Sequence, residues 1–260
     1  MIVDVHQHLP QQDLDEHLAR TKAICDRLGI DRVCMFGRDN DLTLEAAKKD
    51  PDWIVAFVYI QPGEGDPDLV SRYHDRGFKG VKLIRPTANY DDEQFHPIYK
   101  QAEERGMPVL FHTGVVARGG SWEKIPEPQN VSSARMHPLF LDGIARLFPR
   151  LPIVMAHLGV ASFDDGGMVT KWNYNVYADL CGAMMSRARL KGEMWAFERF
   201  SEALWWEGAI EKLVFASDWP GEDMEWAFKC YQRFLDYVQA PKDVREAVMG
   251  GTMAKLLQLE

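Results

Sequence analysis

Short runs of β-forming residues alternate with helix-like stretches along the whole chain, and this alternation constrains the fold more than any other feature. Each of eight runs is followed by a stretch that is helical or helix-like. Strict alternation predicts parallel strands, because parallel neighbours need a crossover connection. The expected strands are residues 1–10, 31–37, 53–60, 78–84, 107–113, 152–158, 175–181 and 212–218. The expected helices are residues 11–28, 42–49, 67–75, 91–105, 135–148, 165–172, 192–208, 223–238 and 241–257.

The length of the chain decides between the two common parallel folds. At 260 residues, eight such units match a closed (β/α)8 barrel, which typically needs about 250 residues. No G-x-G-x-x-G motif follows any run, so the usual reason to prefer an open dinucleotide-binding sheet is missing. We therefore predict an α/β protein in which residues 1–260 form one TIM-barrel domain.

Charge and composition narrow the expected partners and location. The formal net charge is -9 and no basic block offsets it, which argues against binding to nucleic acid. No run of 18 apolar residues and no signal-peptide pattern occur, so we expect a cytoplasmic protein without a membrane partner. The four cysteines are dispersed and form no CxxC motif, which predicts reduced thiols. The expected partner is a small molecule, and Trp205 and Trp206 are candidates for a homo-oligomer contact or for covering the barrel.

Two histidines end the first run, which reads MIVDVHQHLP. His6 and His8 are two residues apart, so on a strand they share a face, with Cα atoms roughly 6.5–7 Å apart. Two imidazoles in this arrangement can bind one metal ion. An isolated HxH fits equally well a strand with one capping histidine and one exposed histidine, so the metal hypothesis needs further ligands.

Further ligand types stand where other strands end, which is where barrel enzymes place their chemistry. His112 ends the fifth run, His157 the sixth and Asp218 the eighth. Each has an ordinary alternative: a buried hydrogen-bonded histidine, or an aspartate that caps a helix. A single metal site explains them together. Histidine nitrogens with a carboxylate suit zinc, with manganese or iron as alternatives.

Six segments in order carry a resemblance to a known family: VDVHQH, GFKGVKL, GMPVLFHTG, LPIVMAHLG, NVYADLCG and KLVFASDWP. Together they resemble amidohydrolase family 2, the metal-dependent barrel enzymes that include amino-carboxymuconate-semialdehyde decarboxylase. The resemblance implies that His6, His8, His112 and Asp218 bind one divalent ion and that His157 is the acid–base residue. The chain departs from the family at residues 250–252, where asparagine is usual, and at Cys181, where serine is frequent. These departures concern substrate contacts more than metal binding.

The chemistry of such a site indicates a reaction class. A divalent ion lowers the pKa of its water from 15.7 to about 7. Asp218 would accept the proton, and His157 would polarise the substrate or protonate its leaving group. We expect hydrolysis of a small carboxylated or cyclic ester, lactone or amide, with non-oxidative decarboxylation as the alternative. A barrel that used its metal only structurally would instead show four protein ligands and no water.

Four residues are candidates for contacts with the substrate. Lys82 would point into the barrel, where a lysine needs a partner, or would be exposed if the strand register is different. Arg85 and Arg118 lie on loops after strands, where they would bind a carboxylate bidentately or remain solvated. Trp219 would form a pocket wall or only pack.

Overall fold

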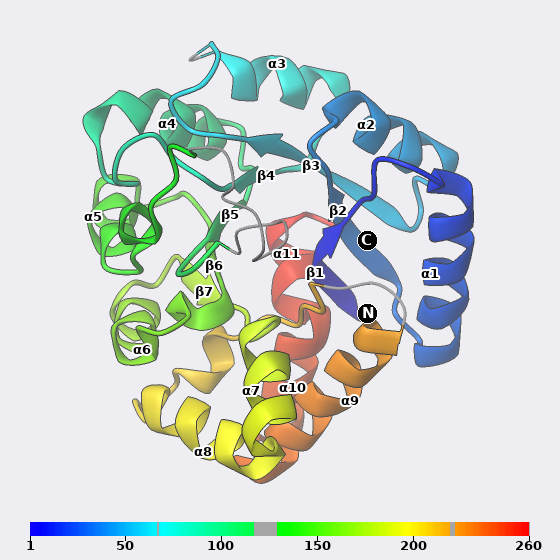
Figure 1. Ribbon diagram of the computed structural model, residues 1–260, viewed down its shortest axis with the longest axis vertical. Coiled ribbons are helices and arrows are strands. Elements are labelled where there is room, and N and C mark those ends of the chain that lie inside the picture. The colour runs from blue at the N-terminus through cyan, green and yellow to red at the C-terminus, as the bar shows by residue number, and fades with distance from the viewer. Residues whose placement is uncertain (67, 117–128, 219–221, 260) are drawn as a thin grey trace, which may run out of the picture.

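Seven parallel strands form one curled sheet with helices around its outside (Figure 1). The computed structural model describes residues 1–66, 68–116, 129–218 and 222–259. The strands follow one another in chain order, from β1 to β7. Each pairs in parallel with the next, as the alternating pattern predicts.

The strands are short, with three to seven residues each. They are β1 (Val3–His8), β2 (Arg32–Phe36), β3 (Ile54–Ile60), β4 (Gly80–Leu83), β5 (Val109–His112), β6 (Ile153–Ala156) and β7 (Val176–Ala178). The α-helices are α1 (Leu14–Leu28), α2 (Asn40–Lys49), α3 (Leu69–Arg76), α4 (His96–Glu104), α5 (Phe140–Leu147), α6 (Phe163–Trp172), α7 (Ala183–Lys191), α8 (Glu193–Ala203), α9 (Glu222–Tyr237), α10 (Lys242–Glu246) and α11 (Thr252–Leu256). Short 3-10 or π segments are η1 (Glu93–Phe95), η2 (Ser133–Met136), η3 (His157–Gly159), η4 (Ile210–Lys212) and η5 (Ala247–Gly251).

The expected eighth strand, residues 212–218, is not a regular strand. Lys212 ends η4, and residues 213–218 make two isolated bridges, Leu213 with Ala178 of β7 and Asp218 with Gln7 of β1. The Asp218 N–H donates to the His6 carbonyl at 2.8 Å. Asp218 itself has a φ of 68°, a left-handed conformation that cannot continue a strand. The segment therefore lies between β7 and β1 without a full ladder.

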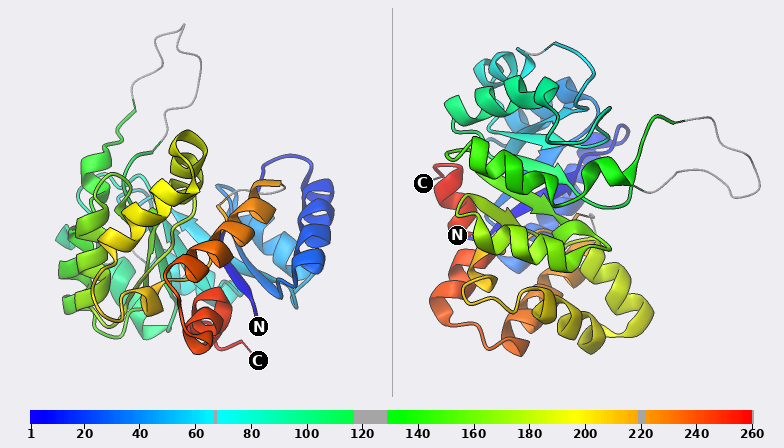
Figure 2. Two further views of the ribbon diagram at one scale, coloured as in Figure 1. Left: turned by 90° about the horizontal axis from the view of Figure 1, so that it is seen from below. Right: turned by 90° about the vertical axis from the view of Figure 1, so that its left-hand side faces the viewer.

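Apolar residues fill both sides of the sheet. The larger cluster lies between the strands and the surrounding helices. A second cluster fills the inner side, where Val5, Phe57 and Val154 pack with Met253 and Leu257 from the C-terminal end of the chain. Figure 2 shows both chain termini at the same end of the molecule. The end of the sheet where the strands begin is thus covered by α11, and the other end is left for the site.

The last helical stretch differs from the prediction of one helix over residues 241–257. It is divided into α10, η5 and α11, with the irregular backbone at Gly250. A Cβ atom at Gly250 would lie 2.5 Å from the Val3 nitrogen and 2.6 Å from the Met1 carbonyl oxygen. The break thus lets the chain pass directly against the start of β1. The sequence prediction also missed α7. Within the described residues, the helices are all too short or too polar to span a bilayer.

Candidate metal centre

Three predicted ligands, His6, His8 and Asp218, meet at the carboxyl end of β1. The Asp218 Oδ1 lies 3.3 Å from the His6 Nε2 and 3.2 Å from the His8 Nε2. The hydrogen bond from the Asp218 N–H to the His6 carbonyl brings the carboxylate to this position. The His6 side chain is buried, whereas 45% of the His8 side chain is exposed. The group therefore has one side in the protein and one open to solvent.

The spacing and protonation of these donors fit a divalent cation. Two ligand atoms about 2.1 Å from a tetrahedral zinc ion lie about 3.4 Å apart, close to the distances from the Asp218 Oδ1. Burial lowers the pKa of His6 well below its usual value, and the Lys82 charge adds to this effect. Burial opposes ionisation of Asp218, but His6 and His8 outweigh it and hold its pKa below the usual range. The set thus offers lone pairs on imidazole and an ionised carboxylate.

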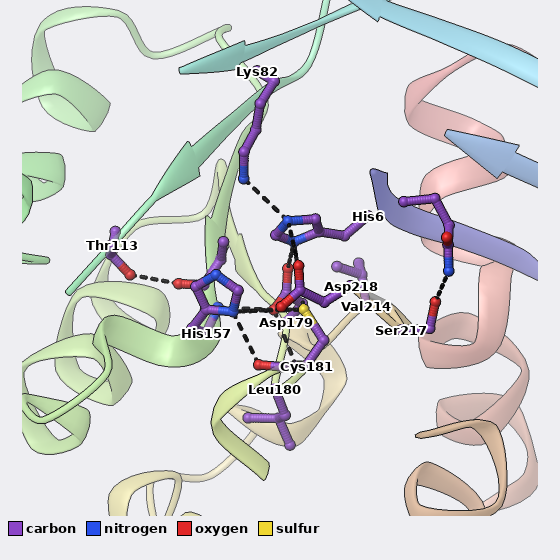
Figure 3. A network of polar contacts seen from close by, with 12 residues as sticks. His6, Lys82, Thr113, His157, Asp179, Leu180, Cys181, Val214, Ser217 and Asp218 are labelled. Atoms are coloured by element: carbon purple, nitrogen blue, oxygen red, sulfur yellow. Dashed lines mark hydrogen bonds and ion pairs between the residues drawn. The ribbon is translucent and has the colours of Figure 1, made fainter. Parts of the chain in front are cut away.

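Asp179, which the sequence analysis did not select, orients His6. Its Oδ2 lies 3.1 Å from the His6 Nδ1, and both side chains are fully buried. Because a carboxylate accepts, the His6 Nδ1–H donates to it, and the lone pair is on Nε2. This lone pair faces the Lys82 Nζ at 3.2 Å and is the one that would bind a metal ion. Figure 3 shows His6 between Lys82 and the two aspartates. Asp179 comes directly after β7, but the expected strand extended over residues 175–181, so the strand-end criterion did not select it.

His157 lies beside His6, with ring centroids 5.1 Å apart. Its backbone N–H donates to the Asp179 Oδ1 at 2.8 Å, and its Nδ1 donates to the Cys181 carbonyl at 2.9 Å. This tautomer leaves the Nε2 lone pair available. His157, His6, Asp179 and Cys181 also form a second compact donor group. Burial raises the pKa of the Cys181 thiol well above its usual value, so the protonated sulfur donates to Asp179 instead.

His112 contacts the His157 ring and is not one of the closely spaced donors. Its ring meets the His157 ring edge-on at 4.9 Å. Its Nε2 is 3.3 Å from the Val115 carbonyl oxygen, and burial lowers its pKa well below the usual value. In the described part of the chain, the two compact groups of possible ligands do not include it. Its role as a ligand therefore stays a prediction.

Of the four predicted substrate contacts, two lie within the described residues. Lys82 is fully buried in β4, with its Nζ 3.2 Å from the His6 Nε2. Burial lowers the pKa of this lysine to about 8, while Asp179 and Asp218 oppose the shift. Arg85 comes two residues after β4 and lines a cavity together with His8. Arg118 and Trp219 lie outside the described residues.

A buried polar network below the site joins β1 to the segment before Asp218. The Asp4 carboxylate accepts from the backbone N–H groups of His6 and Ser217, each at 3.1 Å, and from the Ser217 hydroxyl. The Gln7 amide donates to Asp4 and to Ser217. Burial raises the pKa of Asp4 to about 6, against these hydrogen bonds. Asp4 was also missed in the sequence analysis, because it lies inside the run and not at its end.

Left-handed backbone conformations occur at several residues of the site. Arg85, His157 and Asp218 have φ values of 58°, 65° and 68°. Such conformations are costly for non-glycine residues and often occur at functional sites. Gly182 is also left-handed, and a Cβ atom there would lie 2.7 Å from the Asp218 Oδ2 and 3.2 Å from the His157 Nδ1. The chain after β7 therefore passes close to both side chains.

Comparison with solved structures shows similar folds over nearly the whole chain. A putative amidohydrolase from Staphylococcus aureus is 17% identical with a TM-score of 0.67, and the match covers 99% of each chain. The 5-carboxyvanillate decarboxylase LigW from Sphingomonas paucimobilis is 17% identical with a TM-score of 0.65, over 100% of this chain and 99% of that one. LigW2 from Novosphingobium aromaticivorans, with bound manganese, is 14% identical with a TM-score of 0.63, over 100% and 97%.

Sequence comparison identifies the family. A search of curated proteins found no match. A family model described as amidohydrolase matches residues 3–259. The chain therefore belongs to the amidohydrolase family and is an enzyme of that family.

Proposed function

We propose that the protein is a hydrolase that cleaves a small carboxylated or cyclic ester, lactone or amide with the help of one divalent ion. The observation that carries the proposal is the group His6, His8 and Asp218, whose donor atoms lie within 4.8 Å of one another at the carboxyl end of β1. We propose zinc as the ion, with manganese or iron as alternatives. We also propose that residues 213–218 take the place of the eighth strand in a single (β/α)8 domain.

The side chains around this group have distinct roles in the proposal. A divalent ion supplies a Lewis acid for the substrate oxygen and makes water more acidic. His6 and His8 would hold it, and the Asp179 carboxylate keeps the His6 ring in the required tautomer. Asp218 is ionised and so accepts a proton from water at its carboxylate. His157, fixed through its Nδ1 by the Cys181 carbonyl, would exchange a proton with the substrate at its Nε2.

Non-oxidative decarboxylation is the second candidate. Two of the similar structures are 5-carboxyvanillate decarboxylases. The buried Lys82 adds a specific reason, because its Nζ is 3.2 Å from the His6 Nε2. A cation in that position would stabilise the negative charge that builds up when a carboxylate leaves a carbon atom. His157 would then deliver the proton to that carbon.

Elemental analysis tests the metal site. We expect purified protein to hold about one equivalent of zinc and the variant His6→Ala plus His8→Ala to lose it, because the remaining donors are too few. A matched control is His74→Ala plus His96→Ala, two histidines on outer helices. Less than about half an equivalent in the wild type, unchanged in the first variant, would show that the histidine pair does not hold a metal.

A substrate panel separates the two reactions. Zinc-loaded protein would be assayed for cleavage of small esters, lactones and amides, and in parallel for carbon dioxide release from aryl carboxylates. Cleavage without carbon dioxide release supports the hydrolase, and the reverse supports the decarboxylase. Turnover has to disappear in the His6 and His8 double variant, since otherwise the activity does not come from this site.

A further inference from the structure

A cavity of about 460 Å³ lies where the strands begin, at the end of the sheet opposite the candidate metal centre. Its lining comes from the start of β3, the turns before β4 and β5, the ends of α2 and α3, and residues 256–259. Figure 2 shows both chain termini at this end of the molecule. β3 has seven residues, so the cavity and the metal centre are separated by about 20 Å along the strands. A ligand in this cavity therefore does not touch the metal centre.

The floor of the cavity is aliphatic. Leu44, Ile54 and Met107 belong to the larger apolar cluster, and Val55 and Leu257 belong to the inner one. No phenylalanine, tyrosine or tryptophan is among the described residues that line the cavity. The floor thus offers methyl and methylene contacts and few polar groups. An alkyl chain suits this surface, because it would leave no polar group of its own unpaired there.

The ionisable residues of the lining are all of basic types. They are Lys48, His74, Arg76, Lys79 and Arg105. No aspartate or glutamate is among the described lining residues, although the whole chain has a net charge of -9. The volume is within the range of about 300–1,000 Å³ that is typical of small-molecule pockets. An apolar cavity with a basic rim favours a ligand that has an apolar body and a negative charge.

Acids outside the lining already pair with three of these basic residues. Arg76 forms an ion pair with Asp41. The Arg105 Nη1 lies 3.3 Å from the Asp75 Oδ1, and the His74 Nδ1 lies 3.4 Å from the same oxygen. The positive charge of this part of the rim is therefore largely balanced.

Lys48 and Lys79 remain without an acidic partner. Neither side chain makes a hydrogen bond or ion pair with another described residue, and both residues are exposed. Lys48 lies in the last turn of α2, directly before β3. The Lys79 N–H donates to the Ala56 carbonyl at 2.9 Å, which holds Lys79 beside the start of β3. The methylene groups of such lysines pack along apolar surface while the ammonium group stays in water.

We propose that this cavity binds an aliphatic carboxylate of medium chain length, with the alkyl chain on the apolar floor and the carboxylate at Lys48 and Lys79. The proposal adds a second binding site at the end of the sheet where the strands begin. It does not depend on the reaction at the metal centre, so a hydrolase and a decarboxylase are equally compatible with it.

Calorimetric titration of zinc-loaded protein tests this proposal. The carboxylate probes are acetate, butyrate, hexanoate and octanoate, and octan-1-ol and octylammonium replace the negative charge on the same chain. We expect affinity to rise about two- to fourfold with each added methylene, as for a buried alkyl chain. We expect octanoate to bind about tenfold or more tightly than octan-1-ol, because hydrogen bonds to charged groups are the stronger ones. Octylammonium should bind most weakly.

Substitution of the two lysines tests where the carboxylate binds. Lys48→Gln and Lys79→Gln should each weaken octanoate binding about threefold or more and leave octan-1-ol binding unchanged. The variant with both substitutions should bind octanoate no more tightly than octan-1-ol. The matched control is Lys191→Gln, which removes an exposed lysine from the last turn of another helix, α7, and should bind octanoate as the wild type does. All these variants should keep the zinc content of the wild type.

The metal centre needs its own control, because zinc also binds carboxylates. Octanoate titration is repeated with the His6→Ala plus His8→Ala variant, which should keep the binding that the lysine variants lose. Octanoate binding that disappears with the histidines but not with the lysines, equal affinity for octanoate and octan-1-ol, or an equal loss in Lys191→Gln overturns the proposal. Because the lysines are exposed, their variants decide even if the histidine variant does not fold. Zinc loss from the histidine variant tests only the proposed function.

Discussion

Asp179 accepts hydrogen bonds from both His6, the proposed metal ligand, and His157, the proposed acid–base residue. Its Oδ2 accepts from the His6 Nδ1, and its Oδ1 accepts from the His157 N–H. Asp179→Asn keeps the shape but replaces one acceptor with a donor and removes the charge. We expect metal affinity to fall about 10–100-fold, measured by competition with a chelator. Asp142→Asn, at a partly exposed helix position, is the control, and unchanged affinity in Asp179→Asn would show that this carboxylate does not orient His6.

His157 is predicted to act on protons and not to hold the metal. Its Nδ1 is occupied by the Cys181 carbonyl, and His6, His8 and Asp218 form a compact set without it. We expect His157→Ala to keep its zinc and lose about 10²–10⁴-fold in turnover. Zinc content and kcat are measured together, with His137→Ala as the control. If zinc leaves together with the His157 ring, this residue is a ligand and the proposed role is wrong.

At the scale of residues, sequence reasoning selected side chains by their position at strand ends. It selected His6, His8 and Asp218, whose donors lie within 4.8 Å of one another. It did not select Asp4 or Asp179, because an acid in an apolar run carries no sign of its hydrogen-bond partners. One partner of each acid, Ser217 for Asp4 and His6 for Asp179, lies more than 170 positions away in the sequence. Only the folded chain shows that these acids are satisfied by backbone and imidazole N–H groups.

The turn after β7 gives a test at the scale of elements. Gly182 has a φ of 61°, and a Cβ atom there would press against the Asp218 carboxylate and the His157 ring. Gly106 is left-handed with a φ of 63°, but a Cβ atom there would meet nothing within 4 Å. Both alanine variants should lose about 1 kcal/mol of unfolding free energy from backbone strain. We expect only Gly182→Ala to lose zinc affinity and turnover as well.

The measurements for this pair are urea unfolding, zinc competition and turnover. Both glycines have a positive φ near 60°, so both alanine variants are strained. A loss of zinc affinity and turnover that is confined to Gly182→Ala therefore reports the steric contact. Equal zinc affinity and equal turnover in the two variants would mean that the turn does not shape the site.

The order of helices and strands was largely predictable from the sequence. Which segments form regular strands was not. Seven of the eight expected strands are present, because apolar runs of β-formers between helical stretches are a local signal. Residues 213–218 have the same composition but form only isolated bridges. Their conformation depends on hydrogen bonds from Ser217 to Asp4 and from Asp218 to His6. Such contacts lie outside any local window of sequence.

At the scale of the whole molecule, the C-terminal segment packs on the start of β1. Gly250→Ala would place a Cβ atom 2.5–2.6 Å from backbone atoms of Met1 and Val3, which cannot move as a side chain does. We expect a loss of about 1–3 kcal/mol in unfolding free energy, measured by urea denaturation. Gly143→Ala in α5, where a Cβ atom meets nothing within 4 Å, should instead stabilise by about 0.5–1 kcal/mol. A neutral Gly250→Ala would show that this contact is not tight.

The inner apolar cluster determines by which route substrate and product reach and leave the candidate metal centre. Met253 and Leu257 pack in the interior together with Val5 and Phe57, as expected for a barrel whose interior is a packed core and not a pore. Substrate then enters and product leaves through the same opening, at the carboxyl ends of the strands. A product that leaves slowly blocks the next reactant directly. Inhibition by product should therefore be competitive with substrate.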